Sequence, residues 1–299
     1  MPQTVISGGT GFVGRLIVEQ LLSAGHGITV IGRNQHAKDF FSAPVRFVEG
    51  GLGDNVDYRD IFEIADNYVH ASLDHIAGRL AGGEGDDPKG FALKNLAGAA
   101  ALFKQAKKSK VGRAIFLSDM AVYGRPFDGD HFYETETPEP QNLYARIKSE
   151  TEAVLQAMNS PEFATASLRL APVYGPAGKG KTHPWSKLFK AYMSGQAIRP
   201  FASCQVHGED VGRAVEIMLS TQPIRMAGGI FNVMDMVVDR RDVLALLQKA
   251  IGCDHKLPNK FDRDVSTMNC DKMKGLDWRT GGSVKLSMSL ERMFRSLRN

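Results

Sequence analysis

Short apolar runs alternate with longer amphipathic stretches along the first half of the chain. The apolar runs lie at residues 5–7, 27–31, 45–48, 68–71 and 114–117 and predict strands, whereas the alanine-rich or amphipathic stretches at 15–22, 91–108 and 143–158 predict helices. Strands that alternate with helices favour a parallel sheet covered on both faces. We therefore expect a doubly wound α/β fold over residues 1–170.

The remainder of the chain, residues 171–299, predicts a smaller and mostly helical part. Segments near 206–219 and 230–232 are expected to return to the sheet. A chain of 299 residues with 43% hydrophobic content is long and apolar enough to bury a large core, as one domain or as two closely packed parts.

The most informative stretch is Val5 to Gly14, which reads as a strand, a glycine turn and the start of a helix. Gly8, Gly11 and Gly14 would let the backbone approach a ligand and let the helix pack on the strand. The first amides of that helix and its dipole suit the phosphates of a dinucleotide. A tight turn without a ligand also needs glycine, but the flanking strands and helix favour a dinucleotide.

Arg33 stands at the end of the second predicted strand, with Gly32 before it and Asn34 after it. An acidic residue here holds the ribose 2'-hydroxyl of NAD, whereas an arginine suits the 2'-phosphate of NADP. We therefore predict NADP(H), with NAD(H) as the alternative. An arginine in solvent would give the same pattern; His36 and Lys38 could add to the pocket.

Charge and cysteine content exclude several classes. The net charge is +4, and the basic run at 104–110 ends a predicted helix, so a solvated face is favoured over a nucleic-acid site. Three widely spaced cysteines suggest neither a zinc site nor disulfides. The first strand begins almost at Met1, and no apolar run could span a bilayer. A cytoplasmic protein with no bound metal, membrane or nucleic acid is expected.

Tyr144 and Lys148 are four residues apart on a predicted helix, so their side chains share one face. The helix follows the fifth strand, which ends in Ser118-Asp119. This arrangement resembles that of the extended short-chain dehydrogenase/reductases, the NAD-dependent epimerase/dehydratase family. The motifs that carry the resemblance are Gly8–Gly14, Asn95, Ser118–Gly124, Tyr144–Lys148, Leu168–Pro176, Val206–Val211, Phe231–Val233 and Leu276–Trp278.

The resemblance implies a Rossmann-type sheet with a small, mostly helical C-terminal substrate domain. It also implies hydride transfer to or from a nicotinamide, with Tyr144 as acid/base and Lys148 as its activator. An ordinary phenol titrates near pH 10, so we expect the Lys148 ammonium to lower the pKa of Tyr144. The expected catalytic residues are Tyr144, Lys148, Ser118 and Asp119. The expected cofactor-binding residues are Gly8, Thr10, Gly11, Phe12, Val13, Gly14, Arg33, Asn34, Gly51, Leu52, Ala71, Ser72, Leu73, Asn95, Tyr144, Lys148, Ala171, Pro172 and Val173.

Four positions depart from the family pattern. Asp119 replaces the serine or threonine that polarises the substrate, and a carboxylate only accepts hydrogen bonds. Gly51 replaces an aspartate that contacts adenine, and Pro172 replaces an asparagine. Ser203 replaces an arginine that grips a sugar nucleotide's diphosphate. These changes favour a simple carbonyl, alcohol or sugar-like substrate over a nucleotide sugar.

Three functions stay open on this evidence. The first is a reductase or dehydrogenase, and the second is a nucleotide-sugar epimerase or dehydratase. The third is an inactive protein that keeps NADP(H) as a structural or sensing ligand. The resemblance further implies a homodimer formed by the helices at 91–108 and 143–158, both of which carry apolar residues at helical spacing.

Overall fold

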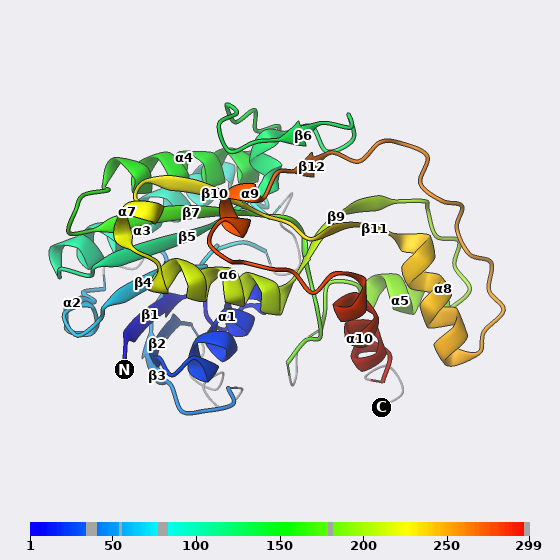
Figure 1. Cartoon of the computed structure of the whole chain (residues 1–299), viewed down its shortest axis with the longest axis horizontal. Helices are drawn as coiled ribbons and strands as arrows, with labels where there is room; N and C mark the ends of the chain where they lie inside the picture. The colour runs from blue at the N-terminus through cyan, green and yellow to red at the C-terminus, as the bar shows by residue number, and fades with distance from the viewer. Residues whose placement is uncertain (34–40, 54–55, 77–82, 179–181, 296–299) are drawn as a thin grey trace.

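A seven-stranded parallel sheet forms the centre of the computed structural model, which describes residues 1–33, 41–53, 56–76, 83–178 and 182–295 (Figure 1). Its order is β10-β7-β5-β4-β1-β2-β3, and each pair is parallel. The strands are β1 (Gln3–Ser7), β2 (Gly27–Gly32), β3 (Arg46–Glu49), β4 (Asn67–His70), β5 (Arg113–Asp119), β7 (Ala164–Leu170) and β10 (Gly229–Val233). The doubly wound parallel sheet predicted from the sequence pattern is confirmed.

Alternating side chains divide the apolar residues of this sheet between two cores. Ile6 joins a core with residues of α1 (Phe12–Ser23) and α6 (Gly208–Ser220), which pack against each other. Its neighbour Val5 faces a core with residues of α2 (Arg59–Phe62), α3 (Pro88–Lys108) and α4 (Leu143–Ala157). Burial on both faces explains the nearly continuous apolar runs of these strands.

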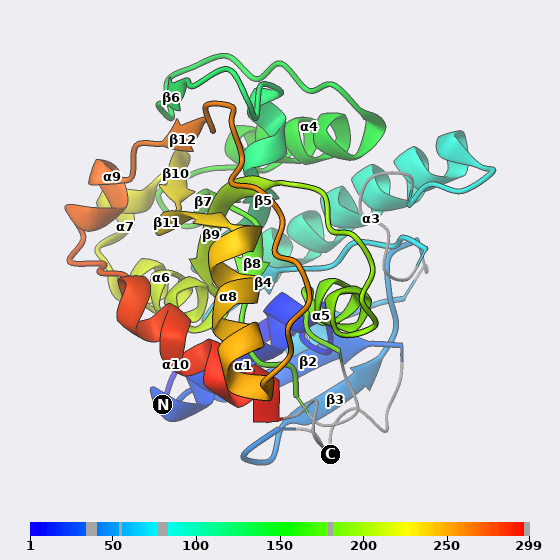
Figure 2. The same cartoon turned by 90° about the vertical axis from the view of Figure 1, so that its right-hand side faces the viewer.

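A second group of strands and helices lies beside the sheet (Figure 1 and Figure 2). Strands β8 (Val173–Tyr174), β9 (Ala202–His207) and β11 (Met236–Asp239) make a three-stranded sheet in the order β11-β9-β8. Helices α5 (Ser186–Met193), α8 (Arg240–Ile251) and α10 (Gly282–Arg295) share a third apolar core. Shorter elements are η2 (Met120–Tyr123), β6 (His131–Phe132), α7 (Pro223–Met226), β12 (Thr267–Met268) and α9 (Asp271–Lys274).

The two segments expected to return to the sheet take different places. Residues 229–233 form β10, which pairs with β7 in the seven-stranded sheet. Residues 206–219 instead cover the end of β9, which belongs to the three-stranded sheet, and most of α6, which packs on α1. The division of the chain at residue 170 into two domains stays a prediction.

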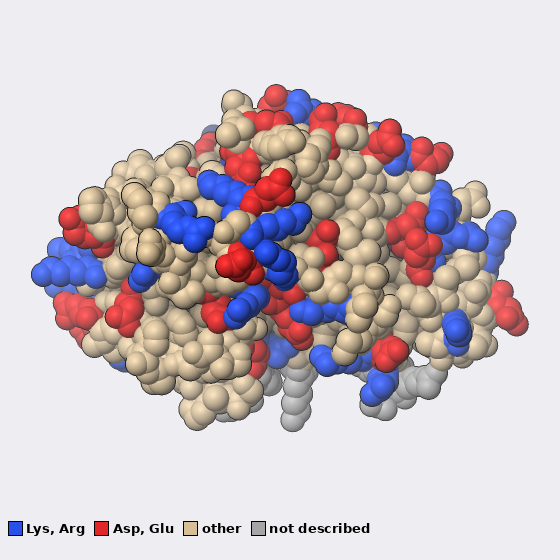
Figure 3. All heavy atoms as spheres, viewed as in Figure 1, with Lys and Arg blue, Asp and Glu red and all other residues tan. Residues whose placement is uncertain are grey.

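Acidic and basic side chains are interspersed on the face seen in Figure 3. Among the described helices, none combines the length and the apolar character that crossing a membrane requires.

Candidate active site

The glycine turn joins β1 to α1 and touches the segment that follows β4. Gly8 has a φ of +76°, and a Cβ there would lie 2.6 Å from the backbone of Ala71 and 2.7 Å from the nitrogen of Ser72. A Cβ on Gly14 would overlap the carbonyl oxygen of Gly8. The turn is closed by the Gly11 amide, which donates to the Gly8 carbonyl at 3.0 Å. Glycine is therefore required by conformation at one position and by packing at the other.

Helix α1 begins at Phe12, and no side chain caps its N-terminus. The first amides of a helix have no intrahelical partners, so they remain available to an anion. Thr10, Phe12 and Val13 lie half-buried around this end. These amides, together with the close approach at Gly8, suit the pyrophosphate of a dinucleotide.

Arg33 follows β2 and forms an ion pair with Asp74, a residue that the sequence analysis did not single out. Its guanidinium donates to Asp74 at 2.6 Å, and Lys94 of α3 lies 2.8 Å from the other oxygen of that carboxylate. The Arg33 side chain is still 69% exposed. Asp74 therefore neutralises part of the cationic site expected for a 2'-phosphate. Asn34, His36 and Lys38 lie outside the described residues.

Asn95 is buried and holds the segment after β4 in place. Its side-chain oxygen accepts from the Asp74 amide at 2.7 Å, and its nitrogen donates to the Asp74 and Phe91 carbonyls, both at 2.9 Å. Its side chain thus positions Asp74 and the neighbouring Leu73, which is half-buried.

The other expected cofactor positions follow β3 and β7, at the same carboxyl edge of the sheet. Leu52 is buried in the core on the α3 side, and Gly51 beside it is half-buried. Ala171 follows β7 and donates its amide to the Val233 carbonyl at 3.0 Å, while the Pro172 carbonyl accepts from the Val206 amide at 3.1 Å. Val173 begins β8, which carries the chain toward the second group of strands and helices.

Tyr144 and Lys148 lie in α4 beside the end of β5. The Tyr144 hydroxyl donates to Asp119 Oδ2 at 2.7 Å, and the other oxygen of that carboxylate accepts from the Ala121 amide at 2.8 Å. Asp119 thus caps the short helix η2 and orients Tyr144 at the same time. The Lys148 ammonium donates to the Leu117 carbonyl at 2.7 Å.

The expectation that Lys148 lowers the pKa of Tyr144 is wrong for this arrangement. Burial and the neighbouring Asp119 carboxylate raise the pKa of Tyr144 well above its ordinary value, because each disfavours a phenolate. Burial also lowers the pKa of Lys148 to about 8, although Asp119 and Glu152 oppose that shift. Tyr144 is therefore a neutral hydrogen-bond donor near pH 7.

Ser118 is buried, and its hydroxyl has no hydrogen-bond partner among the described residues. A buried hydroxyl without a partner is costly, so this group is an unsatisfied polar atom at the end of β5. His70, in contrast, is a core residue: it lies 2.9 Å from Ser7 and 2.8 Å from Tyr68, and burial lowers its pKa to about 3.

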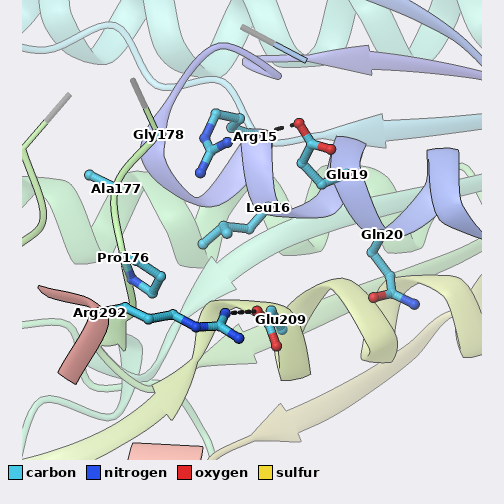
Figure 4. A pocket seen from close by; sticks show the side chains of 9 residues that line it. All are labelled: Arg15, Leu16, Glu19, Gln20, Pro176, Ala177, Gly178, Glu209 and Arg292. Carbon is cyan, nitrogen blue, oxygen red and sulfur yellow. Dashed lines mark ion pairs between the residues drawn. The ribbon is translucent and has the colours of Figure 1, made fainter. Parts of the chain in front are cut away.

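Two clefts lie near these elements. The α1 cleft, of about 440 Å³, is lined by Arg15, Leu16, Glu19, Gln20, Pro176, Ala177, Gly178, Glu209 and Arg292 (Figure 4). The β9 cleft, of about 430 Å³, lies between α5, β9 and the start of α8. It is lined by Pro184, Trp185, Lys187, Leu188, Ala191, Gln196, Ala197, Ile198, Arg199, Phe201, Ser203, Gln205, Val238, Arg240 and Val243. Within the described ranges, no three acidic, histidine or cysteine side chains are grouped to hold a metal ion.

Comparison with known proteins agrees with this geometry. The model of the NAD dependent epimerase/dehydratase family matches residues 4–233. UDP-glucose 4-epimerase of Haemophilus influenzae is 28% identical over 222 residues, which cover 69% of this chain and 64% of that protein. The chain thus matches less than two thirds of that relative's length.

Solved structures of similar proteins share the fold over nearly the whole chain. UDP-N-acetylglucosamine 4-epimerase from Methanobrevibacter ruminantium, in complex with UDP-N-acetylmuramic acid, has a TM-score of 0.82 at 19% identity and covers 99% of this chain and 98% of its own. UDP-glucose 4-epimerase from Thermus thermophilus, in complex with NAD, has a TM-score of 0.75 at 23% identity, with 98% and 99% coverage.

Proposed function

Because the chain belongs to the NAD-dependent epimerase/dehydratase family, we propose that it is a nicotinamide-dependent oxidoreductase acting at a secondary alcohol or carbonyl carbon. The observation that carries the proposal is the position of the Tyr144 hydroxyl, which meets Asp119 at the carboxyl end of β5. The glycine turn follows β1, and only β4 separates these two strands in the sheet. A proton donor and a dinucleotide site thus share one edge of the sheet.

The bound nicotinamide would supply or accept the hydride. Tyr144 gives a proton to the forming alkoxide when a carbonyl is reduced, or takes one when an alcohol is oxidised. Because its pKa is raised, the phenol is protonated at neutral pH and can donate, whereas alcohol oxidation needs the phenolate. Lys148 lies on the same helix face and places its charge near both Tyr144 and Asp119. Asp119 orients the phenol. Ser118, whose buried hydroxyl has no partner among the described residues, would polarise a substrate oxygen only if the end of β5 shifted to expose it.

For the cofactor we propose NADP(H), with NAD(H) as the alternative. Arg33 supports NADP(H), since an exposed guanidinium at the end of β2 suits a 2'-phosphate. Asp74 opposes it by pairing with Arg33, and the Thermus thermophilus structure holds NAD. The pyrophosphate would lie on the amides from Gly11 to Val13, with Ala71 and Ser72 beside it.

For the substrate we propose a carbonyl, alcohol or sugar-like compound. For the location of the protein we propose the cytoplasm. The absence of an arginine at Ser203 supports this class over a nucleotide sugar. A nucleotide-sugar epimerase is the alternative that the names of the relatives favour. A third candidate is a protein that keeps the cofactor without turnover, and Asp119 supports it because a carboxylate repels a developing oxyanion.

A substrate panel with both reduced cofactors tests the proposal. We expect NADPH to bind more tightly than NADH, and at least one aldehyde, ketone or UDP-sugar to be turned over by the parent protein but not by Tyr144→Phe. If no compound gives Tyr144-dependent turnover in the parent, yet Asp119→Ser creates it, the cofactor-holding protein without turnover becomes the better description.

We further propose a homodimer formed through α3 and α4. These two helices pack against each other. Leu93 of α3 is 70% exposed, and alanines of both helices, such as Ala97 and Ala153, are exposed as well. Light scattering at micromolar concentration should report a dimer for the parent and a monomer for Leu93→Glu. Ile224→Glu, at an 82% exposed site on α7, is the matched control and should stay dimeric. A monomeric parent contradicts this part of the proposal.

A further inference from the structure

Helix α4 faces the sheet with three polar side chains, spaced four residues apart. Tyr144, Lys148 and Glu152 lie one turn after another on the same side of the helix, and all three are buried. Tyr144 donates to Asp119, and Lys148 donates to the Leu117 carbonyl, so both bonds lead to the last residues of β5. Hydrogen bonds have defined distances and angles, whereas apolar packing is not directional. This face therefore determines closely how α4 lies on the sheet.

Glu152 is bound by Arg169, a residue of β7 that is also buried. The Arg169 Nε atom donates to both carboxylate oxygens, at 3.1 and 3.3 Å, and its Nη2 atom donates to Oε2 at 2.8 Å. Parallel bonds between a guanidinium and a carboxylate fix the angle between the two groups as well as their distance. The ion pair thus joins α4 to β7 in one orientation.

Arg169 also contacts the short helix η2, whose N-terminus is capped by Asp119. The guanidinium carbon lies 4.7 Å from the centre of the Tyr123 ring, at the end of η2. Tyr123 is fixed in turn, because its hydroxyl donates to Asn232 Oδ1 of β10 at 2.8 Å. One guanidinium thus touches α4, which carries the phenol, and η2, whose cap is the carboxylate that binds the phenol.

The place of Arg169 in the sheet brings the ion pair close to the same strand end. In the ladder of β5 and β7, Arg169 is the partner of Ser118, and the next pair is Asp119 with Leu170. Among the described residues, neither member of the ion pair bonds to Tyr144. The pair can therefore act on the site only through the elements that it connects.

We propose that Glu152 and Arg169 are positioning residues: their ion pair fixes α4 and η2 against the end of β5, and it thereby sets the contact between Tyr144 and Asp119. The inference rests on the proposed function and adds two residues to it. The alternative is that the pair only stabilises the fold. A buried ion pair often contributes little stability relative to apolar side chains of similar size, so replacing both residues together separates the two roles.

The double variant Glu152→Met/Arg169→Met tests this assignment, because it leaves no unpaired buried charge. We expect it to fold and to bind NADPH as the parent does, whereas kcat on a substrate that the parent turns over falls about tenfold or more, with little change in KM. The matched control is Arg213→Met/Glu216→Met. It removes a pair in which an exposed arginine of α6 donates to both oxygens of a glutamate, and it should keep the parent's kcat.

A second measurement does not depend on turnover. Protein that is isotope-labelled at the tyrosine Cζ carbon gives an NMR signal for each tyrosine, and the signal missing from Tyr144→Phe belongs to Tyr144. In the parent this signal should titrate only at high pH, because burial and Asp119 raise the pKa of Tyr144. In the folded double variant the contact with Asp119 is no longer fixed, so the signal should titrate at lower pH.

The assignment is overturned if the folded double variant keeps either the parent's kcat or the parent's Tyr144 titration. Unfolding temperatures show whether the variant folds. If it does not, Arg169→Lys takes its place: lysine keeps a cation but not the parallel bonds, so kcat should fall about threefold and the signal should shift in the same direction. An Arg169→Lys protein that matches the parent also overturns the assignment.

Failure of the proposed function gives a different result. A parent that does not bind NADPH, or that shows no Tyr144-dependent turnover, contradicts the proposed function itself. The NMR titration of Tyr144 still tests the ion pair in that case, because it reports the contact with Asp119 and not the reaction.

Discussion

Asp119 ends β5 and Asp74 lies shortly after the neighbouring strand β4, yet the two carboxylates are satisfied in opposite ways. Asp74 lies between two cations, Arg33 at 2.6 Å and Lys94 at 2.8 Å. Asp119 is bound by a phenol and a backbone amide, and it has no ion-pair partner within the described part of the chain.

This difference shows how surroundings set the role of a carboxylate. The charge of Asp74 is balanced by Arg33 and Lys94, so its main effect is to reduce the positive charge that these two side chains offer to a cofactor. The charge of Asp119 is balanced only at longer range by Lys148, and its main effect is to hold Tyr144 protonated. We expect substitutions at the Asp119 site to change catalysis and those at the Asp74 site to change cofactor choice.

Removing the phenol should have the largest effect. Tyr144→Phe keeps the ring but removes the hydroxyl, and we expect turnover to fall about 1000-fold, since general acid–base catalysis contributes roughly 10²–10⁴-fold. The loss should be equally large in the Asp119→Ser background, because Asp119 acts through Tyr144. Steady-state rates of both variants measure this, with NADPH affinity as the control for folding. A double variant as active as Asp119→Ser alone would show that another group moves the proton.

Replacing Asp119 should shift the pH profile. Asp119→Asn removes the negative charge that, together with burial, raises the pKa of Tyr144, so that pKa should fall toward its ordinary value. The rate of alcohol oxidation, which needs phenolate, should then rise at lower pH than in the parent. Rates measured between pH 6 and pH 11 provide the test. An unchanged profile would show that Asp119 does not affect the titration of Tyr144.

Replacing Asp74 should have a smaller effect, on cofactor preference alone. Asp74→Asn frees Arg33 and Lys94, and we expect the ratio of NADPH to NADH affinity to rise about five- to tenfold, or roughly 1–1.4 kcal/mol. Asp57→Asn removes an exposed carboxylate that pairs with Arg59 and serves as the matched control. Direct titration with both cofactors measures the ratio. A ratio that falls would show that Asp74 itself favours NADPH.

Local sequence patterns were sufficient to predict the sheet, and the resemblance to a known family nominated Tyr144, Lys148 and Asp119. Spacing within a helix places Tyr144 and Lys148 on one face, and a strand end places Asp119 at the carboxyl edge. The roles of these residues stay predictions. The bond from Tyr144 to Asp119 reverses the expected pKa shift, and it depends on how α4 lies against β5, which local spacing does not define.

Asp74 and the ion pair of Glu152 with Arg169 were not predicted because the partners are distant in the sequence. Asp74 lies in a loop without periodicity and meets residues from β2 and α3. Glu152 meets Arg169 because α4 lies over β7, and how a helix crosses a strand does not follow from the spacing of residues in either element.

The place of β10 in the sheet has a consequence for synthesis of the protein on the ribosome. Strand β7 is buried along its whole length, and its outer neighbour is β10, which follows only after α5, β9, α6 and α7. Until residues 229–233 have been translated, β7 has one unpaired edge, a form prone to association with other chains. Chaperones that shield strand edges are therefore most useful to this chain late in its synthesis, after residues 1–170 have already been made.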